Sequence, residues 1–170
     1  LLGRAVSKFI PADDLIVPYS ATSLDDAEAI VHVIGISEND LRKQQVSGFY
    51  KDIELGEPPI TTDEIKEKER QIQGVTKNNQ EDQYTILEMH VNLDLPGFED
   101  VDPETGEPTG IKLPYVVTIA EANTKILSIR RNYLKEDLRK QKINYFVQFK
   151  FLPGLGFYGF GLIHMIGGLS

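Results

Sequence analysis

The chain has no cysteine, no tryptophan and only three histidines in 170 residues. Without cysteine there is no disulfide, no thiolate nucleophile and no cysteine-based zinc site. The three histidines, His32, His90 and His164, confine imidazole chemistry to a few positions. A length of 170 residues fits one domain, or one domain with an arm.

Positive charge is scarce as well. The chain has 18 Lys and Arg against 26 Asp and Glu, a net charge of -8. Because phosphate binding needs clustered cations, nucleic acid is not expected to bind over the whole surface. One local basic strip remains, which either meets nucleic acid or an acidic partner, or is a solvated turn after a strand. Its members are Arg130, Arg131, Lys135, Arg139, Lys140 and Lys142.

The two ends suggest a piece of a longer protein. The chain begins at Leu1, without Met and without a basic region before a long apolar run, so no signal peptide is predicted. It ends in a run over 154–170 that is rich in glycine and aromatic residues and has no polar tail. Natural termini are usually solvated, and we therefore expect the chain to be a fragment.

The first half mixes short strands and helices. Strands are predicted over 14–17 and, as a buried strand, over 29–34, with one turn capped by Ser23 between them. Ser37, with Asp40 three residues on, predicts a helix over 38–46 that ends at Gly48.

A second helix is predicted over 62–73. Thr61 and Glu64 form a capping box for it. Its only apolar residues are Ile65 and Ile72, so it is expected to lie on the surface or against another subunit.

The second half predicts antiparallel β structure. Strands are expected over 84–93, 113–121, 125–131 and 144–151, with a tight turn at 122–124 in which Asn123 takes the left-handed conformation. These four strands predict a β-meander and, with the short helices, an α+β fold. We expect an α+β domain over 1–150 and a glycine- and aromatic-rich segment over 151–170.

An acidic loop between two of these strands has a partial calcium-site pattern. Asp100, Asp102 and Glu104 have the alternate spacing of a calcium loop. However, Gly106 falls one place late, Pro103 stiffens the centre, and no glutamate stands at the twelfth position. The pattern favours a solvated hairpin tip.

Glu88 and His90 share one face of the strand over 84–93, as in a metal site or a base with its orienting acid. No other histidine motif accompanies them, and the favoured interpretation is three unrelated histidines with local hydrogen bonds. No nucleophile triad or cofactor motif is found. We predict no catalytic residue, no metal ligand and no cofactor.

The glycines over 154–161 do not match a phosphate-binding loop, because the Gly-Lys-Ser/Thr ending is missing. The run is also too broken by Pro153 and glycines to be a dependable membrane span. Sharply turning backbone that packs against a neighbour is favoured. The predicted interface residues are Phe157, Tyr158, Phe160, Ile163, Arg130 and Arg131.

Three segments of the sequence resemble a known family. Residues 14–28 (DLIVPYSATSLDDAE) and 37–50 (SENDLRKQQVSGFY) resemble the middle of portal proteins from short-tailed, podovirus-type bacteriophages. Residues 149–170 (FKFLPGLGFYGFGLIHMIGGLS) resemble the segment that enters the central helical region of these proteins. The resemblance implies a wing-like portal fragment.

The resemblance also implies a function. Portal proteins are structural head-tail connectors without enzymatic activity, usually rings of about twelve subunits at one vertex of the virion, assembled in the host cytoplasm. Viral DNA is packaged and ejected through the ring. Terminase, capsid and tail or adaptor proteins dock on it, and no membrane is involved. The expected partners are therefore copies of the chain and these proteins.

Two other functions remain open from the residues. One is a metal-dependent hydrolase that uses His90, Glu88 and the acidic loop. The other is a phage β module that binds carbohydrate or a receptor, although the absence of tryptophan weakens the usual stacking platform.

Overall fold

A computed structural model describes residues 6–56, 83–150, 152–154 and 156–159. The helix predicted over 62–73, with its capping box, lies outside these ranges. The described elements, in chain order, are η1 (Ala12–Asp14), β1 (Leu15–Ile16), β2 (Ala29–Ser37), α1 (Glu38–Val46), β3 (Gln83–Leu93), β4 (Leu113–Ala120), η2 (Glu121–Asn123) and β5 (Ile126–Arg131).

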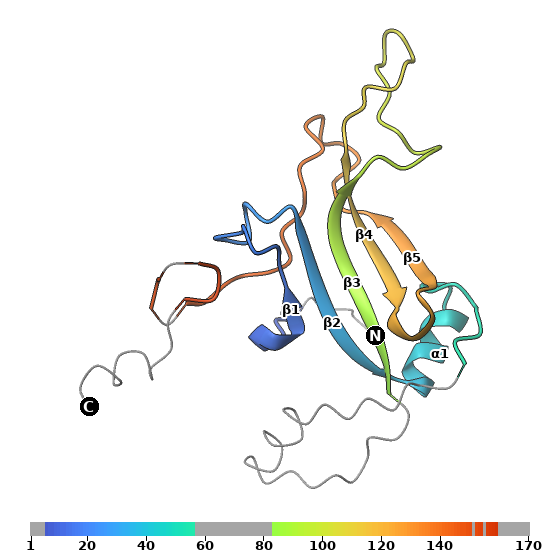
Figure 1. The fold of residues 1–170 in the computed structure, drawn as a ribbon. Helices are drawn as coiled ribbons and strands as arrows, with labels where there is room; N and C mark the ends of the chain where they lie inside the picture. Colours follow the sequence, from blue (N-terminus) through green and yellow to red (C-terminus); the bar gives the residue numbers. More distant parts are fainter. Residues whose placement is uncertain (1–5, 57–82, 151, 155, 160–170) are drawn as a thin grey trace, which may run out of the picture. The chain divides into compact units, whose positions relative to one another are not determined.

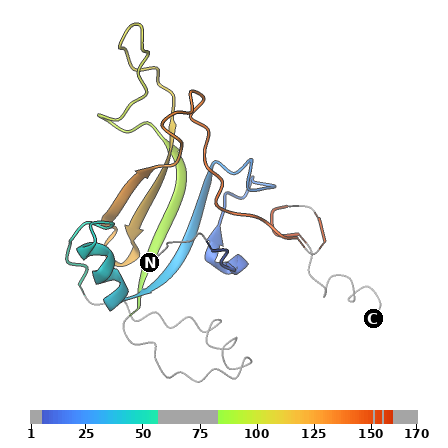
Figure 2. The same ribbon diagram turned by 180° about the vertical axis from the view of Figure 1, so that it is seen from behind.

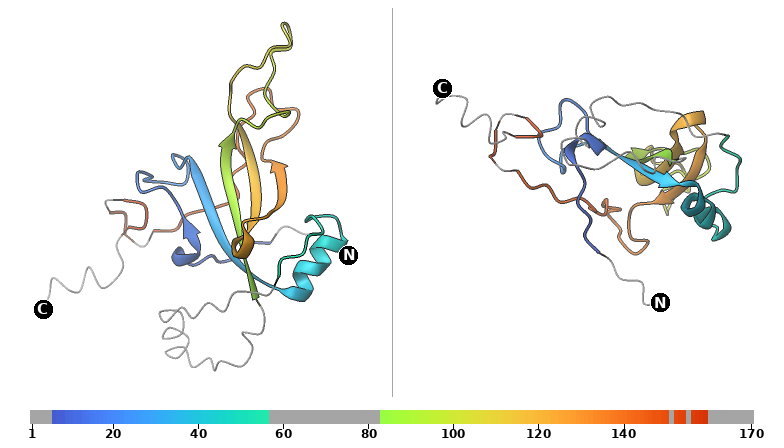
Figure 3. Two further views of the ribbon diagram at one scale, coloured as in Figure 1. Left: turned by 45° about the vertical axis from the view of Figure 1, so that its right-hand side comes forward. Right: turned by 90° about the horizontal axis from the view of Figure 1, so that it is seen from below.

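The five strands form one antiparallel sheet in the order β1-β2-β3-β4-β5 (Figure 1). Neighbours in the sheet are therefore neighbours in the sequence, which confirms the predicted β-meander and the α+β fold class. β1 lies beside the first residues of β2, with Leu15 opposite His32 and Ile16 opposite Val31 (Figure 3).

One predicted strand is absent. Residues 144–150 belong to no strand, so the prediction of a strand over 144–151 is wrong for these described residues. The meander is instead completed by β2, which the sequence indicated only as a separate buried strand. That strand is present, but only Ile30 in it is buried, so the predicted burial is also wrong. Side chains rather than ladder hydrogen bonds hold 144–150, as described below.

The link between β3 and β4 is long and partly ordered by itself. Val101 and Pro108 form an isolated antiparallel bridge, and the hairpin extends beyond the ends of β3 and β4 (Figure 2). Asp102 donates its backbone N–H to the carbonyl oxygen of Glu107 at 2.9 Å. The acidic loop is therefore a hairpin, as the alternative to a calcium loop predicted.

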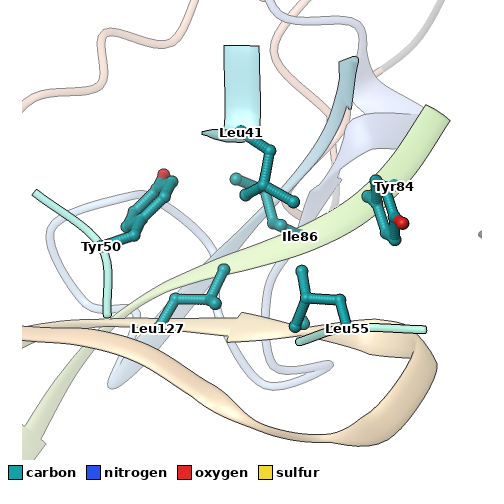
Figure 4. Packing of buried hydrophobic residues seen from close by; sticks show 7 residues of the cluster. Leu41, Tyr50, Leu55, Tyr84, Ile86 and Leu127 are labelled. Carbon is teal, nitrogen blue, oxygen red and sulfur yellow. The ribbon is translucent and has the colours of Figure 1, made fainter. Parts of the chain in front are cut away.

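The chain divides into two compact units. Unit 1 comprises residues 1–33, 88–116 and 130–170, and unit 2 comprises 34–87 and 117–129. In unit 2, residues of α1, β3, β4 and β5 and of the loop after α1 form one buried apolar cluster (Figure 4). Its members are Leu41, Tyr50, Leu55, Tyr84, Ile86, Ala120 and Leu127.

α1 has the ends that its sequence predicts. The Ser37 hydroxyl accepts the backbone N–H of Asp40 at 3.2 Å and donates to the Asp40 carboxylate at 3.1 Å. Leu41 and Gln45 form the buried face, and the Gln45 amide donates to the carbonyl oxygen of Ile53 at 2.9 Å. Gly48 follows with φ +77, a left-handed value that ends the helix.

The turn between β4 and β5 differs from the prediction in one residue. Thr124, not Asn123, takes the left-handed conformation, with φ +53. Asn123 instead ends the short helix η2, and its side chain is occupied: the carbonyl oxygen accepts the Lys125 N–H at 3.1 Å, and the amide donates to the carbonyl oxygen of Leu55 at 3.2 Å. The left-handed residue of the turn is therefore one position later than predicted.

Unit 1 has a smaller apolar cluster of its own. Ala21, Ala27, Ile30 and Phe157 are buried there. The partly buried residues packed against them are Leu15, Val17, Leu24 and Phe146. The described residues 152–154 and 156–159 thus belong to the same unit as the start of the chain.

Truncation of Leu127 should be the most informative test of the unit 2 cluster. Its side chain is 0% exposed, whereas its neighbour Ile126 is 41% exposed. Leu127→Ala should lower the free energy of unfolding by about 2–5 kcal/mol, because a buried side chain is lost and a cavity remains. Ile126→Ala, the matched control, should cost about 1 kcal/mol or less. Urea unfolding measures both, and equal losses would contradict this core assignment.

The left-handed Thr124 gives a second stability test. A β-branched residue is disfavoured at positive φ, whereas asparagine tolerates it. Thr124→Asn should therefore raise the free energy of unfolding by about 0.5–1 kcal/mol. Ala122→Asn, at an exposed position of η2, should not stabilise the chain. A loss of stability in Thr124→Asn would show that the threonine is not strained.

Candidate functional site

Residues 142–150, which we call the strap, run as extended chain in unit 1 (Figure 1). A lysine at each end of the strap donates hydrogen bonds to backbone carbonyl oxygens. The Lys142 ammonium donates to the carbonyl oxygens of Leu24 and Asp25, each at 3.2 Å. The Lys150 ammonium donates to the carbonyl oxygen of Thr22 at 2.9 Å. Side chains, and not a strand ladder, thus attach the strap to the loop before β2.

Between the two lysines, three side chains of the strap contact other residues of unit 1. The Asn144 amide donates to the Asp25 carboxylate at 3.4 Å, and the Gln148 amide donates to the carbonyl oxygen of Phe157 at 2.7 Å. Between them, Phe146 packs against the apolar cluster of unit 1. The inward side of the strap is therefore mainly polar, with one aromatic anchor.

Three residues between these anchors are exposed, and we call Tyr145, Val147 and Phe149 the outward row. Their side chains are 62%, 77% and 92% exposed. The Tyr145 ring also lies edge-on to His90, with a centroid distance of 5.7 Å. In extended chain, successive side chains point to opposite sides, so inward polar anchors place the apolar residues outward. A row of three large exposed apolar side chains marks a contact surface more readily than isolated ones do. We take the outward row as the candidate functional site.

The sequence showed the alternation but not its direction. Phe149 is exposed, whereas Gln148 and Lys150 on either side of it donate hydrogen bonds within unit 1. Tyr145 and Val147 were not predicted as interface residues, although the same period of two includes them. The missing information is that Lys142, Asn144, Gln148 and Lys150 find acceptors in their own unit.

Beneath the strap, Glu88 on β3 is held between two basic groups. Its carboxylate lies 3.2 Å from His90 Nε2 and 3.8 Å from the Arg130 guanidinium. The hydrogen bond from His90 lowers the pKa of Glu88, and partial burial opposes this shift. The sequence placed Glu88 and His90 on one face of the strand, and the structure shows that the two side chains are in contact.

The histidines at 32 and 90 are connected through the strap. The Phe146 ring lies edge-on to both imidazoles, with centroid distances of 4.9 Å to His90 and 6.1 Å to His32. Burial lowers the pKa of His32, although the charge of Glu88 acts in the opposite direction. His32 and His90 thus share a contact with Phe146 that the sequence did not indicate, and His164 lies outside the described residues.

The surroundings of His90 offer little room for a substrate. The cavity beside it has a volume of about 20 Å³, which is enough for one water molecule. Asn132 lines the same cavity, and its buried side-chain oxygen has no hydrogen-bond partner among the described residues. One solvent molecule fits both this volume and this acceptor.

Metal ligands are not gathered in the part of the chain that the structure describes. No group of three or more His, Asp or Glu side chains there could hold an ion. In the acidic loop, Asp100 pairs with Lys140, and the Asp102 carboxylate accepts the backbone N–H of Glu104 at 2.8 Å. These carboxylates are thus engaged within the hairpin and with a lysine.

The predicted interface residues are divided by the structure. Phe157 is buried in its own unit, 8% exposed, so its ring already contacts the chain itself. Tyr158 is 58% exposed, and its hydroxyl donates to the carbonyl oxygen of Leu15 at 3.0 Å. Arg130 pairs with Glu88, and Arg131 is exposed. Phe160 and Ile163, also predicted as interface residues, lie outside the described residues.

The sharp turn predicted in the glycine-rich run is present at Gly159. Its φ is +70, and a Cβ there would lie 2.6 Å from the carbonyl oxygen of Leu152. This residue must therefore be glycine for both its conformation and its close approach.

None of the described helices has the length and apolar character needed to cross a membrane. No known family model, curated protein or solved structure matches the chain.

The pKa of His32 predicts a pH dependence of stability. In the unfolded chain histidine titrates near about 6.5, and burial lowers the folded value. The unfolded state therefore binds more protons between the two values, so stability is present above about pH 6.5 and is lost as the pH falls. In His32→Gln, the free energy of unfolding should vary less between about pH 7.5 and 5.5 than in the wild type.

Urea unfolding at each pH measures this slope. The lowered pKa of Glu88 acts only at lower pH, near and below the ordinary glutamate value of about 4.3, so it does not mask the effect. Equal slopes in the two proteins would contradict the burial of neutral His32.

Proposed function

We propose that this chain is a structural subunit that works by contacting copies of itself and other proteins. The observation that carries the proposal is the outward row of Tyr145, Val147 and Phe149 on the strap. Burial of exposed apolar and aromatic side chains against a partner contributes favourable binding free energy, because apolar surface is removed from water. Aromatic residues are also enriched at protein interfaces.

The arrangement of the row supports contact rather than catalysis. Its inward neighbours Lys142, Asn144, Gln148 and Lys150 hold the strap through five or more hydrogen bonds to the chain. These bonds hold the backbone of the strap, and a backbone that is already held loses less entropy when a partner binds. The water-sized cavity at His90 is consistent with a structural role for the Glu88–His90 pair.

More specifically, we propose a portal-type subunit of a short-tailed bacteriophage, in a ring through which viral DNA is packaged and ejected. This rests on the resemblance of residues 14–28, 37–50 and 149–170. The outward row includes the start of the last of these segments. The proposed partners are about twelve copies of the chain, with terminase, capsid and tail or adaptor proteins, at the portal vertex of the virion.

Replacement of the outward row tests the proposal. In the product of the complete gene that encodes this chain, Tyr145→Ser/Val147→Ser/Phe149→Ser should reduce the ring fraction about tenfold or more, because apolar contact area is lost. The matched control is Phe9→Ser/Tyr19→Ser/Val46→Ser, which replaces the same residue types at positions 86%, 107% and 74% exposed. Electron microscopy and sedimentation velocity count the rings.

Thermal unfolding should show that both triple variants remain folded, because the replaced side chains are exposed. Rings that form equally well in the row variant and the control would refute the role of the row. A wild-type protein that stays monomeric at every concentration would refute the proposed function itself.

A further inference from the structure

Unit 1 contains a groove of about 250 Å³ whose lining has a different charge from the rest of the chain. Its cations are Lys112, Arg139, Lys140 and Lys142, and its only acid is Asp100. The chain as a whole carries a net charge of -8. This groove is therefore a local positive surface on an acidic protein.

Two of the four cations are already used within the chain. Lys140 pairs with Asp100, and Lys142 holds the strap. The side chains of Lys112 and Arg139, in contrast, form no ion pair and no hydrogen bond with other described residues, and both residues are exposed. These two charges are available to a partner.

The loop that carries Arg139 is held in one shape. The Asp137 carboxylate accepts the backbone N–H of Arg139 at 3.0 Å and that of Gln141 at 2.9 Å. Between them, Lys140 takes a φ of +49, which is uncommon for a residue with a side chain. Such conformations persist where surrounding contacts enforce them, and they are found most often at binding sites.

The groove also has apolar walls. Leu138 is 97% exposed and Ile111 is 56% exposed, and both line it. A nucleic-acid backbone would use the cations but would leave these side chains without apolar contact. An acidic peptide that also carries apolar side chains would use both, so the lining favours a peptide.

The chain has a segment with this chemistry in its own hairpin. Phe98 and Val101 are 61% and 52% exposed, and the exposed acids Glu104 and Glu107 follow them. Lys140 already binds a carboxylate of this hairpin, Asp100. Because copies with a net charge of -8 repel one another, contact between them needs a local region of opposite charge.

We infer that the groove of one copy binds the acidic hairpin, residues 98–107, of a second copy. This inference rests on the proposed function, because it names one contact of the assembly. The contact is heterologous, groove to hairpin, and a contact of this kind closes into a ring when the rotation between copies permits it.

Charge reversal tests the groove. Lys112→Glu/Arg139→Glu should raise the dissociation constant of self-association about tenfold or more, as loss of two opposed charge pairs predicts. The control Lys51→Glu/Lys135→Glu makes the same change in net charge at exposed lysines that do not line the groove. Sedimentation velocity of the 170-residue chain, from about 50 to about 500 mM NaCl, should also show salt-weakened association of the wild type.

A charge swap tests the pairing. Glu104→Lys/Glu107→Lys should weaken self-association alone, and the chain that combines all four substitutions should regain it, because lysines of the hairpin then meet glutamates of the groove. Thermal unfolding of each variant shows that it is folded. Restoration in the fourfold variant identifies the two surfaces as partners, because no wild-type groove or hairpin is then present.

Several results would overturn the inference. Equal weakening in the groove variant and its control, or no restoration in the fourfold variant, would show that the two surfaces do not meet. Loss of binding to a single-stranded DNA of about 20 nucleotides in the groove variant, with unchanged self-association, would assign the groove to nucleic acid. The same groove substitutions are then made in the product of the complete gene. Rings that persist there would refute this contact and leave the proposed function standing. Absence of rings in the wild-type product of the complete gene would refute both.

Discussion

The hydrogen bonds from the side chains of the strap to the loop before β2 are the contacts on which the candidate site depends. Lys142 and Lys150 donate to backbone carbonyl oxygens that no strand pairing satisfies in this arrangement. Each such bond is modest in net free energy, but a charged donor makes it stronger than a neutral one. With these polar side chains engaged in the unit, Val147 and Phe149 remain exposed, and Tyr145 is exposed beside His90.

Charged side chains in unit 1 also form close pairs between acids and basic groups. Glu88 lies between His90 and Arg130, and Asp100 lies against Lys140. The Lys140 ammonium compensates the buried Asp100 carboxylate, and the hydrogen bond from His90 stabilises the partly buried Glu88 carboxylate, which burial would otherwise penalise. The remaining cations, Lys112 and Arg139, stand out because the rest of the chain is acidic. The apolar row and the cationic groove are two surfaces of unit 1 with different chemistry, and both suit association with protein.

Local rules accounted for much of the fold. Ser37, Asp40 and Gly48 determine both ends of α1, and the period-two patterns of β3, β4 and β5 gave these strands to within one or two residues. The same rules failed at Thr124 and at 144–150. At Thr124 the distant carbonyl oxygen of Leu55 engages Asn123 and displaces the left-handed residue by one. At 144–150 a strand-like pattern is present, but its partners are the carbonyl oxygens of Thr22, Leu24 and Asp25, more than a hundred residues away.

The sequence by itself determined the composition limits, the α+β class with its meander, the capped helix and the placement of Glu88 and His90 on one face of a strand. These features depend on residues close together in the chain, where spacing alone decides which groups meet. Only the tertiary structure decided which side of the strap faces solvent, that His32 and His90 share Phe146, and that Lys112 and Arg139 line one groove. Those features depend on contacts between segments far apart in sequence. An alternation of polar and apolar residues does not indicate which of its two faces the rest of the chain covers.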